Sequence, residues 1–126
     1  MPIVNAFEVK GVKVPAPCER IIKVIFAPDL NNVSEVSFTL ALIQPNGHTD
    51  YHTHDRPELI YVVYGWGEAV IEGKVVPIGP DSAIWSPAGE KHQIRNTGDD
   101  MLKLATVFVP AYTSKEIVNR CVSTSK

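Results

Sequence analysis

Three of the four histidines in this chain lie within seven residues, in the stretch GHTDYHTHDRPE at positions 47–58. His52 and His54 are separated by one residue, so on an extended strand both imidazoles lie on the same face, about 6.6–6.8 Å apart along the backbone. Glu58 follows after residues 55–57, where a proline favours a bend that can return the carboxylate to that face. Two neutral nitrogen donors and one carboxylate oxygen suit Fe, Mn, Co, Ni or Zn and leave coordination positions open for water or substrate.

The fourth histidine, His92, follows a Pro-x-Gly sequence at residues 87–89. This sequence predicts a tight turn, which would aim the imidazole from the start of a neighbouring strand. We interpret His48 as an exposed loop residue rather than a ligand and leave open a role at the mouth of a pocket. Cys18 and Cys121 lie near opposite ends of the chain, without C-x-x-C spacing. They therefore predict neither a thiolate zinc site nor a redox motif.

The elements that must position these residues are short runs rich in Val, Ile, Phe and Tyr, separated by many of the ten prolines and eight glycines. Such runs at near-even spacing predict an all-β sandwich or barrel. The expected strands cover residues 21–27, 33–44, 58–65, 68–73, 74–78, 82–86, 92–96 and 101–109. Only the C-terminal tail is predicted to be helical, because residues 113–116 fit a capping box.

Alternation along these strands predicts which side chains face the interior. If Glu58 points inward, Ile60, Val62 and Tyr64 share its face and Tyr61 points away. The same rule predicts two further inward sets, one in the strand before the histidines and one in the last strand: Phe38, Leu40, Leu42 and Gln44, and Leu102, Leu104, Thr106 and Phe108.

The histidines and the glycines around them resemble the two sequence motifs of the cupin family. The first motif is matched by a glycine, an H-x-H pair, a glutamate and a second glycine: Gly47, His52, His54, Glu58 and Gly65. The second is matched at its own spacing by Pro87, Gly89, His92 and Asn96. Two departures lie in turns: the loop after Gly47 is one residue shorter than the pattern, and Asp81 stands where the second motif has a glycine.

The resemblance implies a double-stranded β-helix, the jelly-roll cupin barrel, followed by the short C-terminal helix. We expect one cupin domain over residues 1–126, with its core motifs at about 44–97. The resemblance also implies one divalent transition metal per chain (Fe, Mn, Ni, Co or Zn), held by His52, His54, Glu58 and His92. Because the chain carries one such domain, we expect a homodimer.

Composition excludes several other classes of protein. The formal net charge is −2 and no block of Lys or Arg stands out, so a nucleic-acid partner is not expected. The N-terminus lacks the pattern of a signal peptide, and no apolar run approaches the length of a membrane span. We therefore expect a cytoplasmic protein that does not bind membranes.

A metal with these ligands can bind dioxygen or an anion, polarise a carbonyl, or lower the pKa of bound water. We expect a largely apolar pocket with few ionisable groups beyond the ligands, and Arg56 and Arg95 as the only arginines near it. Without a second general base, the metal would carry most of the chemistry. The sequence thus predicts a metal-dependent enzyme acting on a small organic molecule, with an oxidoreductase of the dioxygenase type favoured.

Two alternatives stay open at this point. One is a metal-containing module that binds a small ligand without turning it over. The other is a metal-dependent isomerase, lyase, decarboxylase or cyclase, because members of the cupin family include all of these. The sequence assigns no catalytic residue beyond the metal ligands, and the roles of Arg56 and Tyr64 are left open.

Overall fold

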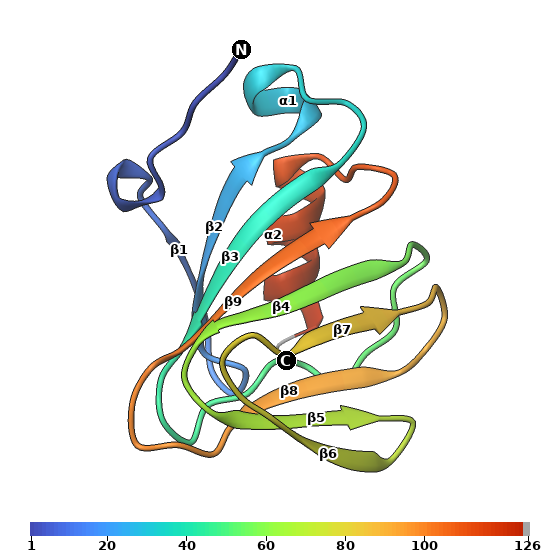
Figure 1. The fold of residues 1–126 in the computed structure, drawn as a ribbon. Helices are drawn as coiled ribbons and strands as arrows, with labels where there is room; N and C mark the ends of the chain where they lie inside the picture. Colours follow the sequence, from blue (N-terminus) through green and yellow to red (C-terminus); the bar gives the residue numbers. More distant parts are fainter. Residues whose placement is uncertain (125–126) are drawn as a thin grey trace.

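The computed structural model describes residues 1–124, which form mainly antiparallel β-strands (Figure 1). Nine strands are present in this part of the chain: β1 Val12–Val14, β2 Arg20–Phe26, β3 Ser37–Ile43, β4 Glu58–Tyr64, β5 Gly67–Ile71, β6 Lys74–Ile78, β7 Ala83–Ser86, β8 His92–Asn96 and β9 Leu102–Phe108. The helical elements are a 3-10 turn η1 Ala6–Glu8, a single turn α1 Pro28–Asn31 and the C-terminal helix α2 Ser114–Thr124. The eight predicted strands and the helix are confirmed, with ends that shift by a few residues, whereas β1, η1 and α1 were not predicted.

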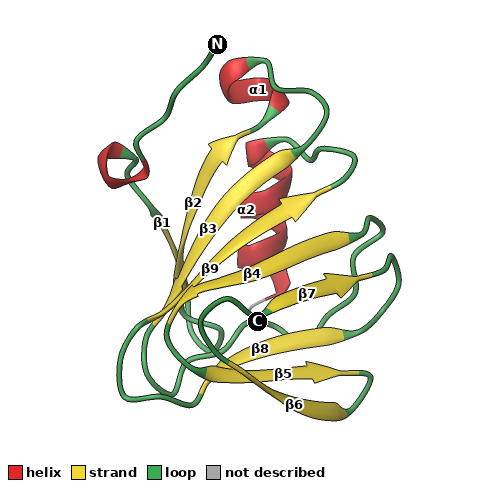
Figure 2. Ribbon diagram, viewed as in Figure 1, coloured by secondary structure: helices red, strands yellow, loops and turns green. Residues whose placement is uncertain are grey.

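The strands form two sheets. The larger has the order β1-β2-β3-β9-β4-β7 and the smaller the order β6-β5-β8. In Figure 1 the smaller sheet lies below β4 and β7. The free edge of β8 is bridged by the segment before β4, through isolated antiparallel pairs of His48 with Arg95 and of His52 with His92. The predicted all-β architecture with a C-terminal helix is thereby confirmed (Figure 2).

Tight turns connect the strands at the positions that the sequence suggested. Glu72 and Gly73 both have positive φ, of 47° and 81°, as a two-residue type I′ hairpin between β5 and β6 requires. Gly89 in the Pro-x-Gly turn has φ +83°. Asp81 has φ 71°, so it adopts the left-handed conformation for which glycine is preferred. This backbone requirement explains why the cupin motif has a glycine at this position.

The inward face of β3 is the opposite of the one expected. Thr39 and Ala41 face the cavity, whereas Phe38 and Leu42 lie half-buried on the other face. Leu40 is also on that outer face, where it lies beside the N-terminal residues 4–7. Leu40 and Leu42 of β3 thus pack outside, beside the N-terminal segment, and only Ile43 at the end of the strand adds a large apolar side chain to the core. The small and polar side chains inside leave room for a site.

The predicted inward faces of β4 and β9 are confirmed for most of their length. Ile60 and Val62 are 2% and 0% exposed, and the four predicted residues of β9 are all buried. Tyr64 departs from the pattern and is 51% exposed, because a register shift between Val62 and Tyr64 reverses the alternation. Tyr61 points away from the interior, as expected, and donates to Asp81.

Helix α2 is capped at its start and packs against β1 and β2. The backbone N–H of Glu116 donates to Thr113 Oγ1 at 3.1 Å, and the N–H of Thr113 donates to the Glu116 carboxylate at 2.9 Å, which confirms the capping box. Asp29 of α1 accepts from the hydroxyl and the backbone N–H of Ser114, and these bonds hold its pKa below the usual value. Neither helix in the described chain is long and apolar enough to cross a membrane.

Candidate metal centre

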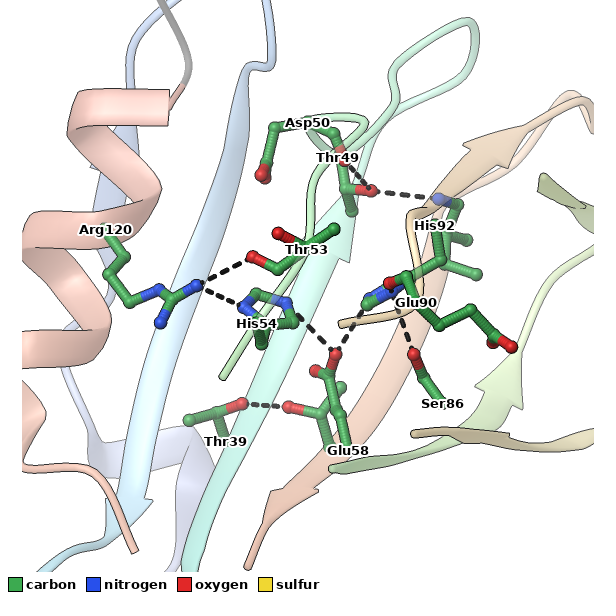
Figure 3. Close-up of polar contacts among 12 residues, drawn as sticks. Thr39, Thr49, Asp50, Thr53, His54, Glu58, Ser86, Glu90, His92 and Arg120 are labelled. Atoms are coloured by element: carbon green, nitrogen blue, oxygen red, sulfur yellow. Dashed lines mark hydrogen bonds and ion pairs between the residues drawn. The ribbon is translucent and has the colours of Figure 1, made fainter. Parts of the chain in front are cut away.

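Three of the predicted donors meet in the interior of the barrel. His54, Glu58 and His92 each offer one ligand atom, and these atoms lie within 4.8 Å of one another. Glu58 begins β4, His92 begins β8, and His54 lies in the segment that leads into β4. Figure 3 shows the two imidazoles on either side of the Glu58 carboxylate, with Glu58 Oε1 at 3.4 Å from His54 Nε2 and 3.0 Å from His92 Nε2.

Electrostatics at this cluster favour a positive charge beside Glu58, which is 7% exposed. Burial alone would raise the pKa of Glu58, but hydrogen bonds from His54 and His92 outweigh it and hold the pKa below the usual value. Burial alone would lower the pKa of His92, but the hydrogen bond and the charge of Glu58 outweigh it and raise that pKa. The buried carboxylate is therefore stabilised by neighbouring imidazole protons, whose place a cation can take.

His92 is oriented as a metal ligand would be. Its Nδ1 lies 3.1 Å from the carbonyl oxygen of Glu90 and 2.9 Å from Ser86 Oγ. A carbonyl only accepts hydrogen bonds, so Nδ1 carries the proton and Nε2 is directed at Glu58. A ligating histidine usually donates its second N–H to such a carbonyl, which fixes the tautomer and the plane of the ring.

His52 lies beside this cluster and is not among its three mutually close donors. Its ring centroid is 5.9 Å from that of His54, and its side chain lines the same pocket. Two backbone hydrogen bonds with His92, of 3.1 and 3.0 Å, hold it in place. Burial lowers the pKa of His52, which keeps the ring neutral. The structure thus joins three of the four predicted ligands and places the fourth next to them.

The pocket around these residues has a long apolar wall, built from both sheets and from α2. It is formed by Ile22, Ala41, Ile60, Ile94, Leu104, Phe108 and Ile117. A hydrogen bond between the Thr39 and Thr106 hydroxyls joins β3 to β9 on the same inner surface.

The pocket also contains charged groups that the sequence reading did not expect. Arg20 of β2 forms an ion pair with Asp50 at 3.1 Å, and the two side chains are 4% and 13% exposed. Arg120 of α2 lines the same pocket. Arg56 and Arg95 do not line it, so the expectation that they are the only arginines near the site was wrong. The expectation of few ionisable groups beyond the ligands was wrong as well.

Arg120 contacts the cluster of candidate metal ligands directly, as Figure 3 shows. Its Nη2 donates to His54 Nδ1 at 2.7 Å and to the carbonyl of Thr53 at 3.0 Å. Its Nη1 donates to the hydroxyl of Tyr112 at 2.8 Å. Tyr112 is buried, and its own hydroxyl donates to Asp55. The C-terminal helix thereby contributes a charged side chain to the pocket.

The residues whose roles were left open lie outside this pocket. His48 is half-buried rather than exposed, with its Nδ1 near Gln93 Nε2 and the Thr49 carbonyl. Arg56 donates to the carbonyl of Ala111 and stacks on the Tyr112 ring at 4.1 Å. Tyr64 donates to Asp100 on the outside of the barrel.

One of the missed residues had a signal in the sequence. Asp50 lies two residues before His52, so simple alternation would have placed it on the ligand face. Arg20 and Arg120 had no local signal, because they come from the two ends of the chain. Neither Cys18 nor Cys121 forms a disulfide bond, and Cys121 lines the pocket.

Known proteins share this architecture and part of the sequence. The family described as Cupin domain matches residues 39–109. Polyketide synthase CurC of Streptomyces cyaneus is 30% identical over 72 residues, and an oxalate-binding protein of Thermotoga maritima is 30% identical over 73. A 5-nitrosalicylic acid 1,2-dioxygenase of Bradyrhizobium is 36% identical over 58 residues. These alignments cover 56%, 57% and 46% of this chain but only 47%, 60% and 28% of the respective relatives.

A solved structure extends the comparison to most of the chain. A Thermotoga maritima protein described as a predicted oxalate decarboxylase superposes with a TM-score of 0.79. The superposition covers 86% of this chain and 99% of the other, at 22% sequence identity, a level that shows the common fold. The family match over more than half of the chain shows that this protein belongs to the cupin family.

Proposed function

We propose that this cupin binds one divalent transition metal and uses it to act on a small organic molecule. The observation that carries the proposal is the cluster of half-buried His54 and buried Glu58 and His92, whose donor atoms lie within 4.8 Å of one another in a pocket with an apolar wall. The donor set fits a metal such as Fe, Mn, Ni, Co or Zn, because two imidazoles and one carboxylate are typical of such sites. We propose His52 as the fourth ligand, since its ring is next to that of His54.

The residues of this chain have separable roles in such a site. Glu58 would neutralise half of the ion's charge, and the Glu90 carbonyl and Ser86 would hold His92 in the orientation that it already has. The apolar wall would exclude water from the reacting groups. A bound metal would supply Lewis acidity and coordination positions for a ligand.

Among reactions, we propose dioxygenase chemistry as the first to test. It is supported by the open positions of a four-ligand site and by the partial likeness to a relative named as a dioxygenase. A metal-dependent isomerase, lyase, decarboxylase or cyclase is consistent with the same site, because Asp50 provides a carboxylate in the pocket that can move protons. The alternative from another class is a binding module without turnover, in keeping with the relative named as an oxalate-binding protein.

The metal site is tested by elemental analysis of the purified protein and by titration with Zn²⁺ and Mn²⁺. We expect one metal per chain in the wild type and a loss of affinity of at least about 100-fold in Glu58→Gln, which keeps the shape but removes the charge. His52→Ala should lose affinity as well. His48→Ala is the matched control, because His48 is also half-buried but does not line the pocket.

Two results would contradict this proposal. Stoichiometric, tightly held metal in Glu58→Gln would exclude the three-residue cluster as the site. Wild-type affinity in His52→Ala would remove His52 alone from the ligand set. Turnover is tested separately by oxygen uptake of the Fe²⁺-loaded protein with diketones, phenols and thiols. Thermal stabilisation by a ligand without consumption of oxygen or ligand would favour the binding module.

A further inference from the structure

The pocket has an excess of positive charge once a divalent cation is bound. Among the described residues that line it, the permanently ionised side chains are those of Arg20, Arg120, Asp50 and Glu58. Two positive and two negative charges cancel within the lining, and the exposed carboxylate of Asp55 forms an ion pair with Arg120 at 3.5 Å from outside it. A divalent ion would therefore leave about one positive charge uncompensated in a largely apolar cavity. Uncompensated charge is costly in such surroundings, and an anionic ligand would offset it.

The two arginines are not equally able to provide contacts for such a ligand. Arg20 is held between Asp50 at 3.1 Å and the carbonyl of Cys18 at 2.7 Å, and it is almost fully buried. Arg120 has a longer and more exposed ion pair, with Asp55 at 3.5 Å. It also donates to His54 Nδ1, a ring nitrogen of a metal ligand. Of the two, only Arg120 has a contact that metal binding must change.

The contact between Arg120 and His54 cannot coexist with a metal on that histidine. A guanidinium is only a donor, so Nδ1 of His54 must accept in the present arrangement. If the metal binds Nε2, the neutral ring carries its proton on Nδ1, and two donors would then face each other at 2.7 Å. If the metal binds Nδ1, it takes the lone pair that Arg120 uses. Either mode of binding removes this hydrogen bond.

The remaining contacts keep the guanidinium at the wall of the pocket. Arg120 still donates to the carbonyl of Thr53 and the hydroxyl of Tyr112, and it stacks on the Tyr112 ring at 5.1 Å. Its ion pair with Asp55 is also kept. The N–H group that had donated to His54 therefore stays beside the metal site. Arginine is the side chain best suited to a planar carboxylate.

We propose that metal binding displaces Arg120 from His54 and that the guanidinium then binds the carboxylate of a small acid whose apolar body lies against the barrel wall. The inference rests on the proposed metal site and specifies its substrate class. Arg120 lies outside residues 39–109, the region matched by the family, so this choice of ligand would be a property of the C-terminal helix.

The test compares Arg120→Met with Arg56→Met in two titrations. Arg56 is the matched control because it also stacks on Tyr112 but does not line the pocket. In the first titration, with Zn²⁺ alone, Arg120→Met should bind at least as tightly as the wild type, since a competitor for His54 is removed. In the second, the Zn²⁺-loaded proteins are titrated with benzoate and isobutyrate and with the neutral amides of both acids.

We expect the affinity of Arg120→Met for both acids to fall about 10- to 100-fold, because a hydrogen bond to a charged group is lost. Its affinity for the neutral amides should equal that of the wild type. Arg56→Met should match the wild type throughout. Arg120→Lys, which keeps the charge and the aliphatic stem, should bind the acids with intermediate affinity. Circular dichroism of each variant shows whether α2 remains folded.

Four outcomes would overturn the inference. Equal affinity of the wild type and Arg120→Met for the acids, or no binding of either acid by the Zn²⁺-loaded wild type, refutes carboxylate recognition while the metal site stands. Weaker Zn²⁺ binding by a folded Arg120→Met refutes the displacement from His54. Failure of the wild type to bind Zn²⁺ or Mn²⁺ refutes the proposed function and this inference together.

Discussion

The pocket is assembled from two regions that differ in how their polar groups are held. The family region, residues 39–109, supplies His54, Glu58 and His92, whose ligand atoms lie within 4.8 Å of one another. The flanking elements β2 and α2 supply Arg20 and Arg120, each of which reaches into the family region for its partner.

The two regions therefore have different roles in the pocket. The family region carries a self-contained donor set, with orientation provided by Ser86 and Glu90, which lie close to His92 in sequence. The flanking elements add charge and shape at the other side of the same cavity. We infer that the proposed metal chemistry depends on the family region, whereas the stability of the pocket and the choice of ligand depend on the flanking elements. Three substitutions test this division.

The largest effect is expected where the two regions meet, at Asp50. Asp50→Ala leaves the buried guanidinium of Arg20 without its carboxylate, which should lower the free energy of unfolding by about 3 kcal/mol, because an uncompensated buried charge is costly. Urea denaturation measures the loss. The double variant Arg20→Met/Asp50→Ala should recover most of it, and an Asp50→Ala protein as stable as the wild type would show that β2 does not depend on this ion pair.

A smaller effect is expected within the family region, at Ser86, which is 2% exposed. Ser86→Ala removes the hydroxyl 2.9 Å from His92 Nδ1 and should weaken Zn²⁺ affinity about 10-fold, because the ring is then less firmly oriented. Competition with a chromophoric chelator measures this affinity. Ser82→Ala is the control, since it also removes a hydroxyl hydrogen bond, to Gly79 in the turn before β7. Similar losses in both variants would contradict a specific role for Ser86.

The smallest effect concerns the contact of α2 with the loop that carries His54. Burial and the hydrogen bond to Asp55 raise the pKa of Tyr112 to about 12, against opposing charges from Arg120 and Arg56. Because the folded value lies above the ordinary value of 10, the stability that this tyrosine contributes is present below pH 10 and is lost as the pH rises through about 12. Tyr112→Phe should lose the tyrosinate absorbance step near pH 12, and an unchanged titration would refute the assignment.

Much of the fold could be predicted because its determinants are local. The hairpin at Glu72-Gly73, the Pro-x-Gly turn and the capping box of α2 each depend on residues within one turn of the chain. The inward face of β3 could not be predicted in this way. Alternation identified its two faces correctly, but which face is inside depends on where the N-terminal segment packs, and that segment covers Leu40 from outside.

The same distinction holds for the site. By itself the sequence determined the fold class, the family resemblance and three donors that do come together, because the bend between His54 and Glu58 and the turn before His92 are short-range features. Only the tertiary structure decided that Arg20 and Arg120 enter the pocket, that Arg56 and Arg95 do not, and that His52 lies beside the cluster. Arg120 and His54 are 66 residues apart and Arg20 and Asp50 are 30 apart. Contacts at such separations follow from how whole elements pack, which no local pattern encodes.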